Sequence, residues 1–190
     1  MELDKLEKFY GLHSKVYDLT RPFFLFSRER ALSMLDLACG TGLNIPYIAR
    51  VINEENITGI DYSESMLARA KTKFPNIRFI QGDISNYKFE ETFDKIICTY
   101  SLSMVESWQE TIQNVRKYLS RNGTFLILDF HPWDGAMKPL YPMFKYWLKM
   151  HGVDPNRDYL LELRRDFKDV EKEVINLGYN QILTAKSPHN

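Results

Sequence analysis

The sequence lacks the features that are typical of secreted proteins, of membrane-spanning proteins and of proteins with structural zinc sites. It has only two cysteines, Cys39 and Cys98, and no CxxC motif, so we expect neither a disulfide framework nor a metal site. No stretch approaches the roughly 20 apolar residues of a membrane-spanning helix. Charged residues are spread through the first part of the chain, which argues against a signal peptide. We therefore expect a cytoplasmic protein.

The sequence also lacks an excess of either charge. Lys plus Arg and Asp plus Glu both total 25, so no overall electrostatic attraction to nucleic acid is expected. A chain of 190 residues with 44% hydrophobic and 26% charged residues is typical of one soluble globular domain. We expect a single domain over residues 1–190.

Strand and helix signals alternate along most of the chain, which predicts a Rossmann-like, doubly wound α/β fold with a mostly parallel sheet of six to seven strands and helices on both faces. Residues 1–31 are expected to form an amino-terminal helical cap, and residues 131–160 a lid insertion. No seventh strand is obvious, so an edge completed by a partner chain in a homodimer is a further expectation. The expected strands are 34–38, 56–60, 77–80, 93–99, 124–130 and 181–185, and the expected helices are 43–53, 64–73, 106–119 and 165–177.

The ends of the first three strands carry glycines and acids. The first strand runs into a turn containing Gly40 and Gly42, Asp61 follows 19 residues after Gly42, and Asp83 follows 22 residues after Asp61. Ligands of doubly wound sheets bind beyond the carboxyl ends of the strands, where glycines let the backbone approach closely. Either acid alone is as well explained as a helix cap or turn residue. Together they predict a nucleoside-binding edge.

The same segments resemble the class I S-adenosylmethionine-dependent methyltransferases. Residues 35–42 (LDLACGTG) are similar to their first motif, with Ala38 in place of the usual first glycine. Residues 59–67 resemble their ribose-binding segment, 81–84 their adenine segment, 93–98 the fourth-strand motif and 119–124 the turn into the fifth strand. The resemblance covers roughly residues 10 to 130.

The resemblance implies S-adenosyl-L-methionine as cofactor and a role for each matching position. Asp36 and the turn at 40–42 would hold the methionine part, and Asp61 would hold the ribose hydroxyls. Tyr62 and Met66 would flank the adenine, and Asp83 with Ile84 would recognise its amino group. The remaining implied cofactor residues are Tyr17, Arg21, Ala38, Cys39, Thr41 and Thr99.

A nicotinamide cofactor is the competing interpretation of the glycine turn. It requires a third glycine at position 45, which is Ile45 in this chain, and it gives Asp83 no role.

Other segments resemble lipid and quinone methyltransferases, and most closely the betaine-lipid enzymes that methylate the amine of diacylglyceryl-homoserine. Residues 10–26, 101–108, 128–130, 144–148 and 152–155 carry this resemblance. It implies methyl transfer to an amine of a small or lipid-like acceptor. Such an amine must arrive deprotonated, and the candidate proton-handling residues are Tyr10, His13, Tyr100 and His131, each of which could instead be a packing or turn residue.

The insertion has an apolar helical stripe formed by residues 140, 143, 144, 147 and 148, with three lysines off the stripe. This pattern fits a lid over the substrate pocket, and it also fits a helix lying in a membrane interface. A quinone-type C-methyltransferase and a non-catalytic cofactor-binding module remain alternative functions. Nucleic-acid modification is disfavoured because no basic run is present.

Overall fold

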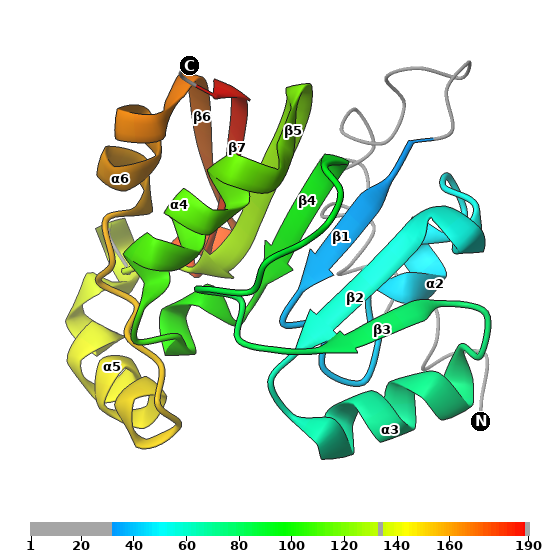
Figure 1. Ribbon diagram of the computed structural model, residues 1–190. Coiled ribbons are helices and arrows are strands. Elements are labelled where there is room, and N and C mark those ends of the chain that lie inside the picture. Colours follow the sequence, from blue (N-terminus) through cyan, green and yellow to red (C-terminus); the bar gives the residue numbers. More distant parts are fainter. Residues whose placement is uncertain (1–31, 133–134, 189–190) are drawn as a thin grey trace.

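The computed structural model of the chain describes residues 32–132 and 135–188, which form a seven-stranded sheet with helices on both faces (Figure 1). The strand order is β3-β2-β1-β4-β5-β7-β6. β1 to β5 are parallel, whereas β7 is antiparallel to both β5 and β6. The predicted mostly parallel, doubly wound sheet is confirmed at the upper end of its expected size. The strands are β1 (Met34–Leu37), β2 (Ile57–Asp61), β3 (Arg78–Gln81), β4 (Phe93–Thr99), β5 (Leu119–Phe130), β6 (Phe167–Ile175) and β7 (Asn180–Pro188).

Two apolar clusters hold helices against the two faces of the sheet. One cluster joins Ile112 of α4 and Leu163 of α6 to Phe125 of β5, and the other joins Ile45 and Ile48 of α2 to the opposite face. No helix within the described residues is long and apolar enough to cross a membrane. The α-helices are α2 (Ile45–Ile48), α3 (Glu64–Lys73), α4 (Trp108–Tyr118), α5 (Tyr141–Met150) and α6 (Tyr159–Asp166), with short 3-10 turns η1 (Glu54–Asn56), η2 (Leu102–Met104), η3 (Gly135–Leu140) and η4 (Asn176–Gly178).

The agreement with the predicted elements is closest where the local signals are strong. α3 and β4 have their predicted bounds, and the Ser63 hydroxyl accepts the Met66 N–H at 3.4 Å as the expected helix cap. α2 is shorter than the predicted helix 43–53, because the chain turns after Ile48, where the Val51 N–H bonds the Ile48 carbonyl three residues back. The predicted cap at 1–31 lies outside the described residues.

The predicted last helix, 165–177, is wrong. α6 ends at Asp166, and residues 167–175 form β6, the edge strand of the sheet. Phe167, Val170 and Val174 stand at helical spacing, and the intervening Lys and Glu residues also favour helix, so the local pattern imitates an amphipathic helix. Pairing with β7 overrides it.

With β6 present the sheet has seven strands, so no strand is missing that a partner chain would have to supply. The new edge is lined by charged, exposed side chains, which protect an edge strand from pairing with another chain. The homodimer stays a prediction, but the absence of a seventh strand no longer supports it.

Candidate active site

The carboxyl ends of β3, β2, β1 and β4 lie in a row, which places the predicted site residues side by side. The Cys39 N–H donates to the Ile60 carbonyl at 3.0 Å, and the Gly82 N–H to the Asp61 carbonyl at 3.0 Å. Leu37 pairs with Cys98 on the other side of β1. The segments that begin at Ala38, Asp61, Gly82 and Thr99 therefore leave the sheet at one edge, as predicted.

The turn after β1 has three left-handed residues at alternate positions, Ala38, Gly40 and Gly42. Gly40 and Gly42 have φ of 55° and 78°, and a side chain at Gly42 would meet the Phe74 ring at 3.0 Å. Ala38 also has a positive φ, 51°, although it carries a methyl group that makes this region costly by roughly 1–2 kcal/mol. Ala38 stands where the first-motif resemblance expects glycine, so the chain adopts a left-handed backbone there at the cost of strain.

Asp61 ties the first two strand ends together. Its Oδ2 accepts the Gly40 N–H and its Oδ1 accepts the Ser63 N–H, both at 2.8 Å. A carboxylate has about four acceptor positions, so both oxygens keep capacity for a further donor such as a ribose hydroxyl. The interpretation as a turn residue and the interpretation as a ligand-binding residue are therefore compatible at Asp61.

Asp36 is fully buried below the turn and is held by Asn44. The Asn44 Nδ2 lies 3.0 and 3.2 Å from the two Asp36 carboxylate oxygens and 2.9 Å from the Thr99 Oγ1. Burial raises the pKa of Asp36 to about 7, against the lowering effect of the Asn44 hydrogen bond. Sequence reasoning missed Asn44, whose signal was an amide between the apolar residues Leu43 and Ile45. This side chain connects the turn after β1 to the end of β4.

The residues predicted for the adenine lie at the ends of β2 and β3. Tyr62 and Met66 are exposed, whereas Ile84 is buried in the core. Asp83 Oδ1 accepts both the N–H and the hydroxyl of Ser85, at 2.9 and 2.7 Å, while Oδ2 has only a 3.5 Å contact with Asn86. Asp83 thus shapes its own turn with one oxygen and has acceptor capacity left on the other.

The end of β4 presents Tyr100 in a left-handed conformation, with φ of 50°. Its side chain is 41% exposed. Partial burial, together with the charges of Tyr179 and Asp129, raises the pKa of Tyr100 to about 12. The phenol is therefore protonated at neutral pH, where it can donate a hydrogen bond but cannot accept a proton.

His131 follows β5 and is buried. Its Nδ1 lies 3.2 Å from the Gly178 carbonyl oxygen, and its backbone N–H bonds the Tyr179 carbonyl. Because a carbonyl oxygen only accepts, Nδ1 carries a proton. His131 thus attaches the end of β5 to the turn before β7, which is the packing alternative considered for this residue.

A network around Asp129 was missed by sequence reasoning. This buried carboxylate accepts the Ser103 N–H at 2.8 Å, the Ser103 hydroxyl at 2.7 Å, the Phe130 N–H at 2.8 Å and the Tyr159 hydroxyl at 3.2 Å. Burial nevertheless raises the pKa of Asp129. Arg157 donates to the Leu102 and Val105 carbonyls, so η2 is held by groups that lie about 25 and 55 residues further along the chain.

Aromatic rings run from the end of β4 to α5. Ring centroids lie 5.4 Å apart between Tyr100 and Phe130, 5.6 Å between Phe130 and Tyr179, 5.1 Å between Tyr179 and Phe144, and 5.9 Å between Phe144 and Trp147. We call these five residues the aromatic row. The expected lid helix α5 is attached to the rest of the domain partly through this row.

Four predicted residues, Tyr10, His13, Tyr17 and Arg21, lie outside the described part of the chain.

The two remaining predicted residues lie in the turn after β1. Cys39 is buried there, and the Thr41 carbonyl accepts a hydrogen bond from the Lys73 ammonium group at 3.3 Å. Within residues 32–132 and 135–188, no group of three His, Cys, Asp or Glu side chains is arranged to hold a metal ion.

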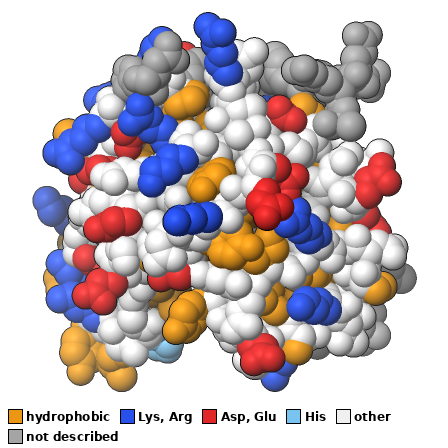
Figure 2. Space-filling model, in the orientation of Figure 1, with side chains coloured by type: hydrophobic (Ala, Val, Ile, Leu, Met, Phe, Trp, Pro, Cys, Tyr) orange, Lys and Arg blue, Asp and Glu red, His pale blue; other side chains and the backbone are white. Residues whose placement is uncertain are grey.

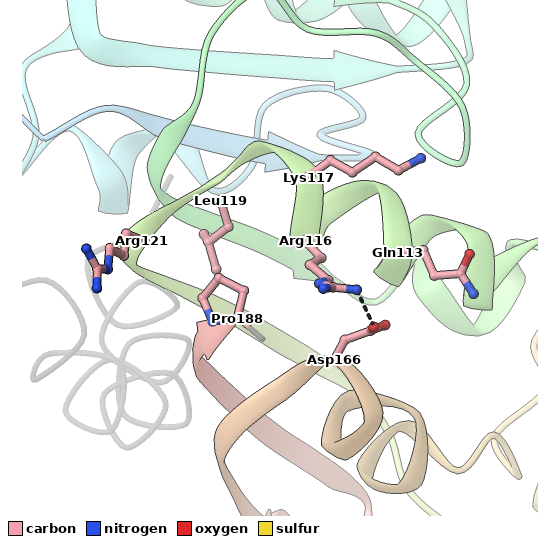
Figure 3. Close-up of a pocket in the computed structure, with 7 residues that line it drawn as sticks. All are labelled: Gln113, Arg116, Lys117, Leu119, Arg121, Asp166 and Pro188. Carbon is pink, nitrogen blue, oxygen red and sulfur yellow. Dashed lines mark hydrogen bonds and ion pairs between the residues drawn. The ribbon is translucent and has the colours of Figure 1, made fainter. Parts of the chain in front are cut away.

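An open pocket of about 710 Å³ lies at the opposite end of the sheet (Figure 3). Arg116 pairs with Asp166 there at 3.3 Å, and basic side chains sit in the last turn of α4, where cations complement the helix dipole. Of the three basic lining residues, Arg116 and Lys117 belong to the last turn of α4 and Arg121 to β5, and the pocket lies away from the strand ends that carry the predicted site. The lining residues are Gln113, Arg116, Lys117, Leu119, Arg121, Asp166 and Pro188.

Comparison with known proteins agrees with this geometry. Residues 34–123 match a family model described as a methyltransferase domain. A malonyl-[acyl-carrier protein] O-methyltransferase of Bacillus anthracis is 32% identical over 120 residues, which are 62% of this chain and 44% of that protein. The ubiquinone/menaquinone biosynthesis C-methyltransferase UbiE of Campylobacter jejuni is 32% identical over 108 residues, 54% of this chain and 46% of that protein.

The chain thus spans less than half the length of these two curated relatives. The crystal structure of the PH0226 protein from Pyrococcus horikoshii has the same fold, with a TM-score of 0.69, 20% sequence identity, and 92% of this chain and 91% of that chain covered. Residues 34–123 are therefore similar to a methyltransferase domain, a similarity that indicates S-adenosylmethionine as the cofactor, and they lie in a doubly wound sheet like that of the solved structure.

Proposed function

We propose that the chain transfers the methyl group of S-adenosylmethionine to an amine of a small or lipid-like acceptor, in the cytoplasm and in peripheral contact with a membrane. The observation that carries the acceptor class is the aromatic row beside the end of β4. Aromatic faces attract cations and exclude water, so they suit an apolar amine whose methylated product is an ammonium ion.

The residues at the strand ends fit the cofactor. In this proposal Asp36, Asn44 and the turn at 38–42 hold the methionine part, Asp61 the ribose, and Tyr62, Met66, Asp83 and Ile84 the adenine, with Thr99 beside the methionine part. Tyr17 and Arg21 are proposed partners of the cofactor carboxylate. When bound, the cofactor supplies a methyl group already activated for in-line displacement. The protein then contributes alignment and exclusion of water.

We call the end of β4 together with η2 the acceptor end of the site. An amine acceptor fits this region better than a carboxylate does. An anion would require a cationic side chain near β4 and η2. Among the described residues, the guanidinium that bonds η2, Arg157, is used to hold the Leu102 and Val105 carbonyls. It also stacks over Trp108, with the guanidinium carbon 6.0 Å from the ring centroid. The electron-rich faces of the aromatic row disfavour an anion further.

The amine loses its proton before or during transfer, and the proposed proton-handling residues are Tyr10, His13, Tyr100 and His131. At neutral pH the Tyr100 phenol is a donor, so its contribution is to orient the acceptor. Proton acceptance then falls to the His13 or the His131 imidazole, and Tyr10, a phenol like Tyr100, would orient the acceptor or relay its proton. We expect the pH profile of the turnover rate to break near the ordinary pKa of histidine, and a profile without that break would contradict this division.

A quinone-type C-methyltransferase is the second candidate. The specific observation in its favour is the 32% identity to the UbiE protein, and a flat ring also stacks on aromatic side chains. The diacylglyceryl-homoserine acceptor expected from the sequence is a specific case of the first candidate function, methyl transfer to an amine.

Transfer of a tritiated methyl group from S-adenosylmethionine to a set of acceptors separates the candidates. The set contains a diacylglyceryl-homoserine-type lipid, a short-chain soluble amine of the same headgroup, a hydroquinone and a malonyl thioester. The proposal expects label on the amines and less transfer in Phe130→Leu, with Phe89→Leu as a matched change outside the row. Label on the ring carbon or ester alone contradicts the proposal, and tight cofactor binding with no labelled acceptor supports a non-catalytic module.

A further inference from the structure

One side of α5 carries large apolar side chains that no other described element covers. The exposed fractions are 72% for Met143, 68% for Tyr146, 50% for Trp147 and 69% for Met150, and Leu140 just before the helix is 50% exposed. Figure 2 shows hydrophobic side chains gathered at the lower left of the molecule, where Figure 1 draws α5. We call these five residues the α5 face.

The lid alternative accounts for the other side of the helix only. Leu148 is buried, and Phe144 contacts Tyr179 through its ring, so the predicted stripe is half packed and half exposed. A lid whose purpose is to cover the site would bury its largest apolar groups against the domain. The α5 face is therefore expected to contact something other than the rest of this domain.

Charge indicates what the α5 face contacts. Residues 135–150 contain Lys138, Lys145 and Lys149 and no Asp or Glu. Lys149 lies in the last helical turn, where the helix dipole also favours a cation, but this does not explain the other two or the absence of acids. A second copy of the chain would bring two such cationic faces together, which is unfavourable. An interface rich in anionic headgroups matches both the lysines and the exposed Trp and Tyr.

The α5 face lies beside the acceptor end of the site. The Asp154 N–H, just after α5, donates to the Ser103 carbonyl at 2.9 Å, and Ser103 belongs to η2, which follows β4. Met104 and Tyr100 are 54% and 41% exposed in the same region. The aromatic row leads from Tyr100 to Trp147 on the face itself.

From these contacts we infer that the α5 face docks on an anionic lipid surface and so brings a membrane-dissolved acceptor to the end of β4. The delivery of the acceptor rests on the proposed function, whereas the docking does not. A helix of ten residues lying in the interface buries its apolar side among the headgroups while its lysines meet the lipid charges.

Flotation of the full chain with phosphatidylcholine vesicles, with and without phosphatidylserine, tests the docking. We expect binding that requires phosphatidylserine and weakens with salt. Lys145→Gln with Lys149→Gln is expected to lower the partition coefficient about 30-fold at low salt, and Met143→Glu with Tyr146→Glu about tenfold or more. Leu161→Glu, a change on an exposed leucine of α6, is the matched control and is expected to bind as the unaltered chain does.

Three results overturn the inference: no binding by the unaltered chain, binding independent of phosphatidylserine, or equal binding by the Met143→Glu, Tyr146→Glu variant. Concentration-dependent dimerisation that this variant abolishes, without vesicle binding, assigns the face to a second copy instead. Methylation of the short-chain soluble amine without vesicles separates the two proposals. Transfer to that amine without docking sinks the inference and the proposed membrane contact but leaves the proposed methyl transfer, and docking without transfer to any amine sinks only the proposed methyl transfer.

Discussion

Two regions along the carboxyl edge of the sheet are built differently. The proposed cofactor end comprises the ends of β1, β2 and β3, and the proposed acceptor end comprises the end of β4 with η2. At the cofactor end, the contacts of Asp61 and Asp83 reach the backbone of turns beside their own strands, such as Gly40 and Ser63 for Asp61. Beside the end of β4, η2 is held by Asp129, which also accepts the Tyr159 hydroxyl, and by Arg157, all from distant elements. The family match, residues 34–123, covers the first end and stops before most of the second.

This difference indicates which end sets which property. A shared set of backbone turns suits one cofactor used by many enzymes, whereas side-chain contacts between distant elements let the acceptor site change without altering the cofactor site. We therefore expect changes at the two ends to affect cofactor and acceptor binding separately.

The largest separation is expected from Asp61→Ala. The change removes the acceptor of two backbone N–H groups and the proposed partner of the ribose, so the Kd for S-adenosylhomocysteine is expected to rise about 100-fold. Calorimetric titration measures it. Glu64→Ala removes the same charge from an exposed position in the first turn of α3 and is expected to change the Kd less than about threefold. Equal Kd values in the two variants would contradict the role of Asp61.

A change at Asp129 is expected to affect the other end. In Asp129→Asn, an amide NH₂ faces a group of hydrogen-bond donors in a buried place, which is expected to lower the free energy of unfolding by about 2 kcal/mol. The KM for the acceptor is expected to rise while the Kd for S-adenosylhomocysteine is unchanged. Denaturant unfolding and steady-state kinetics measure both, with the exposed Asp169→Asn as control. A rise in the cofactor Kd instead would remove the distinction between the two ends.

The pH dependence of cofactor binding is expected to report on Asp36. Its folded-state pKa of about 7 exceeds the unfolded value, so its contribution to stability is full below about pH 4 and is lost as the pH rises towards 7. In the proposed site, ionised Asp36 would attract the ammonium group of the cofactor. The affinity for S-adenosylhomocysteine is therefore expected to increase about tenfold from pH 6 to pH 8. Asp36→Asn should abolish this dependence, and an unchanged profile in that variant would assign it to another group.

The smallest effect is expected at Ala38. Ala38→Gly relieves a left-handed alanine and is expected to raise the free energy of unfolding by up to about 1 kcal/mol. Ala68→Gly, in the exposed interior of α3, is the matched control and is expected to lower it by about 1 kcal/mol. The same sign in both variants would show that the φ of 51° at Ala38 is not a strained position.

Prediction from sequence succeeded where local signals and fold agree. The glycine turn, the acids at 61 and 83 and the Ser63 cap each depend on a few neighbouring residues, and the structure brings their strand ends together as expected. The roles of Tyr100 and His131 were not fixed by the sequence, because burial and Tyr179 raise the pKa of Tyr100 and His131 bonds the Gly178 carbonyl, and both partners lie far along the chain.

The failures have the same cause. β6 was mistaken for a helix because its exposed edge shows no alternation of buried and exposed residues, and only its pairing with β7 makes it a strand. The amide of Asn44 between two apolar residues did not reveal its contact with Thr99, and Asp129 carried no local signal of its contacts with Ser103 and Tyr159, since these partners are 26 to 55 residues away. Long-range polar contacts of this kind are set by tertiary packing.

A crystal structure of the chain with S-adenosylhomocysteine is the most direct test of the account. We predict ribose hydroxyls on the Asp61 carboxylate, the adenine edge at Asp83, and the sulfur directed towards Tyr100 and the end of β4. Ligand density anywhere else, including the pocket between Arg116 and Asp166, would contradict the assignment of the strand ends as the active site.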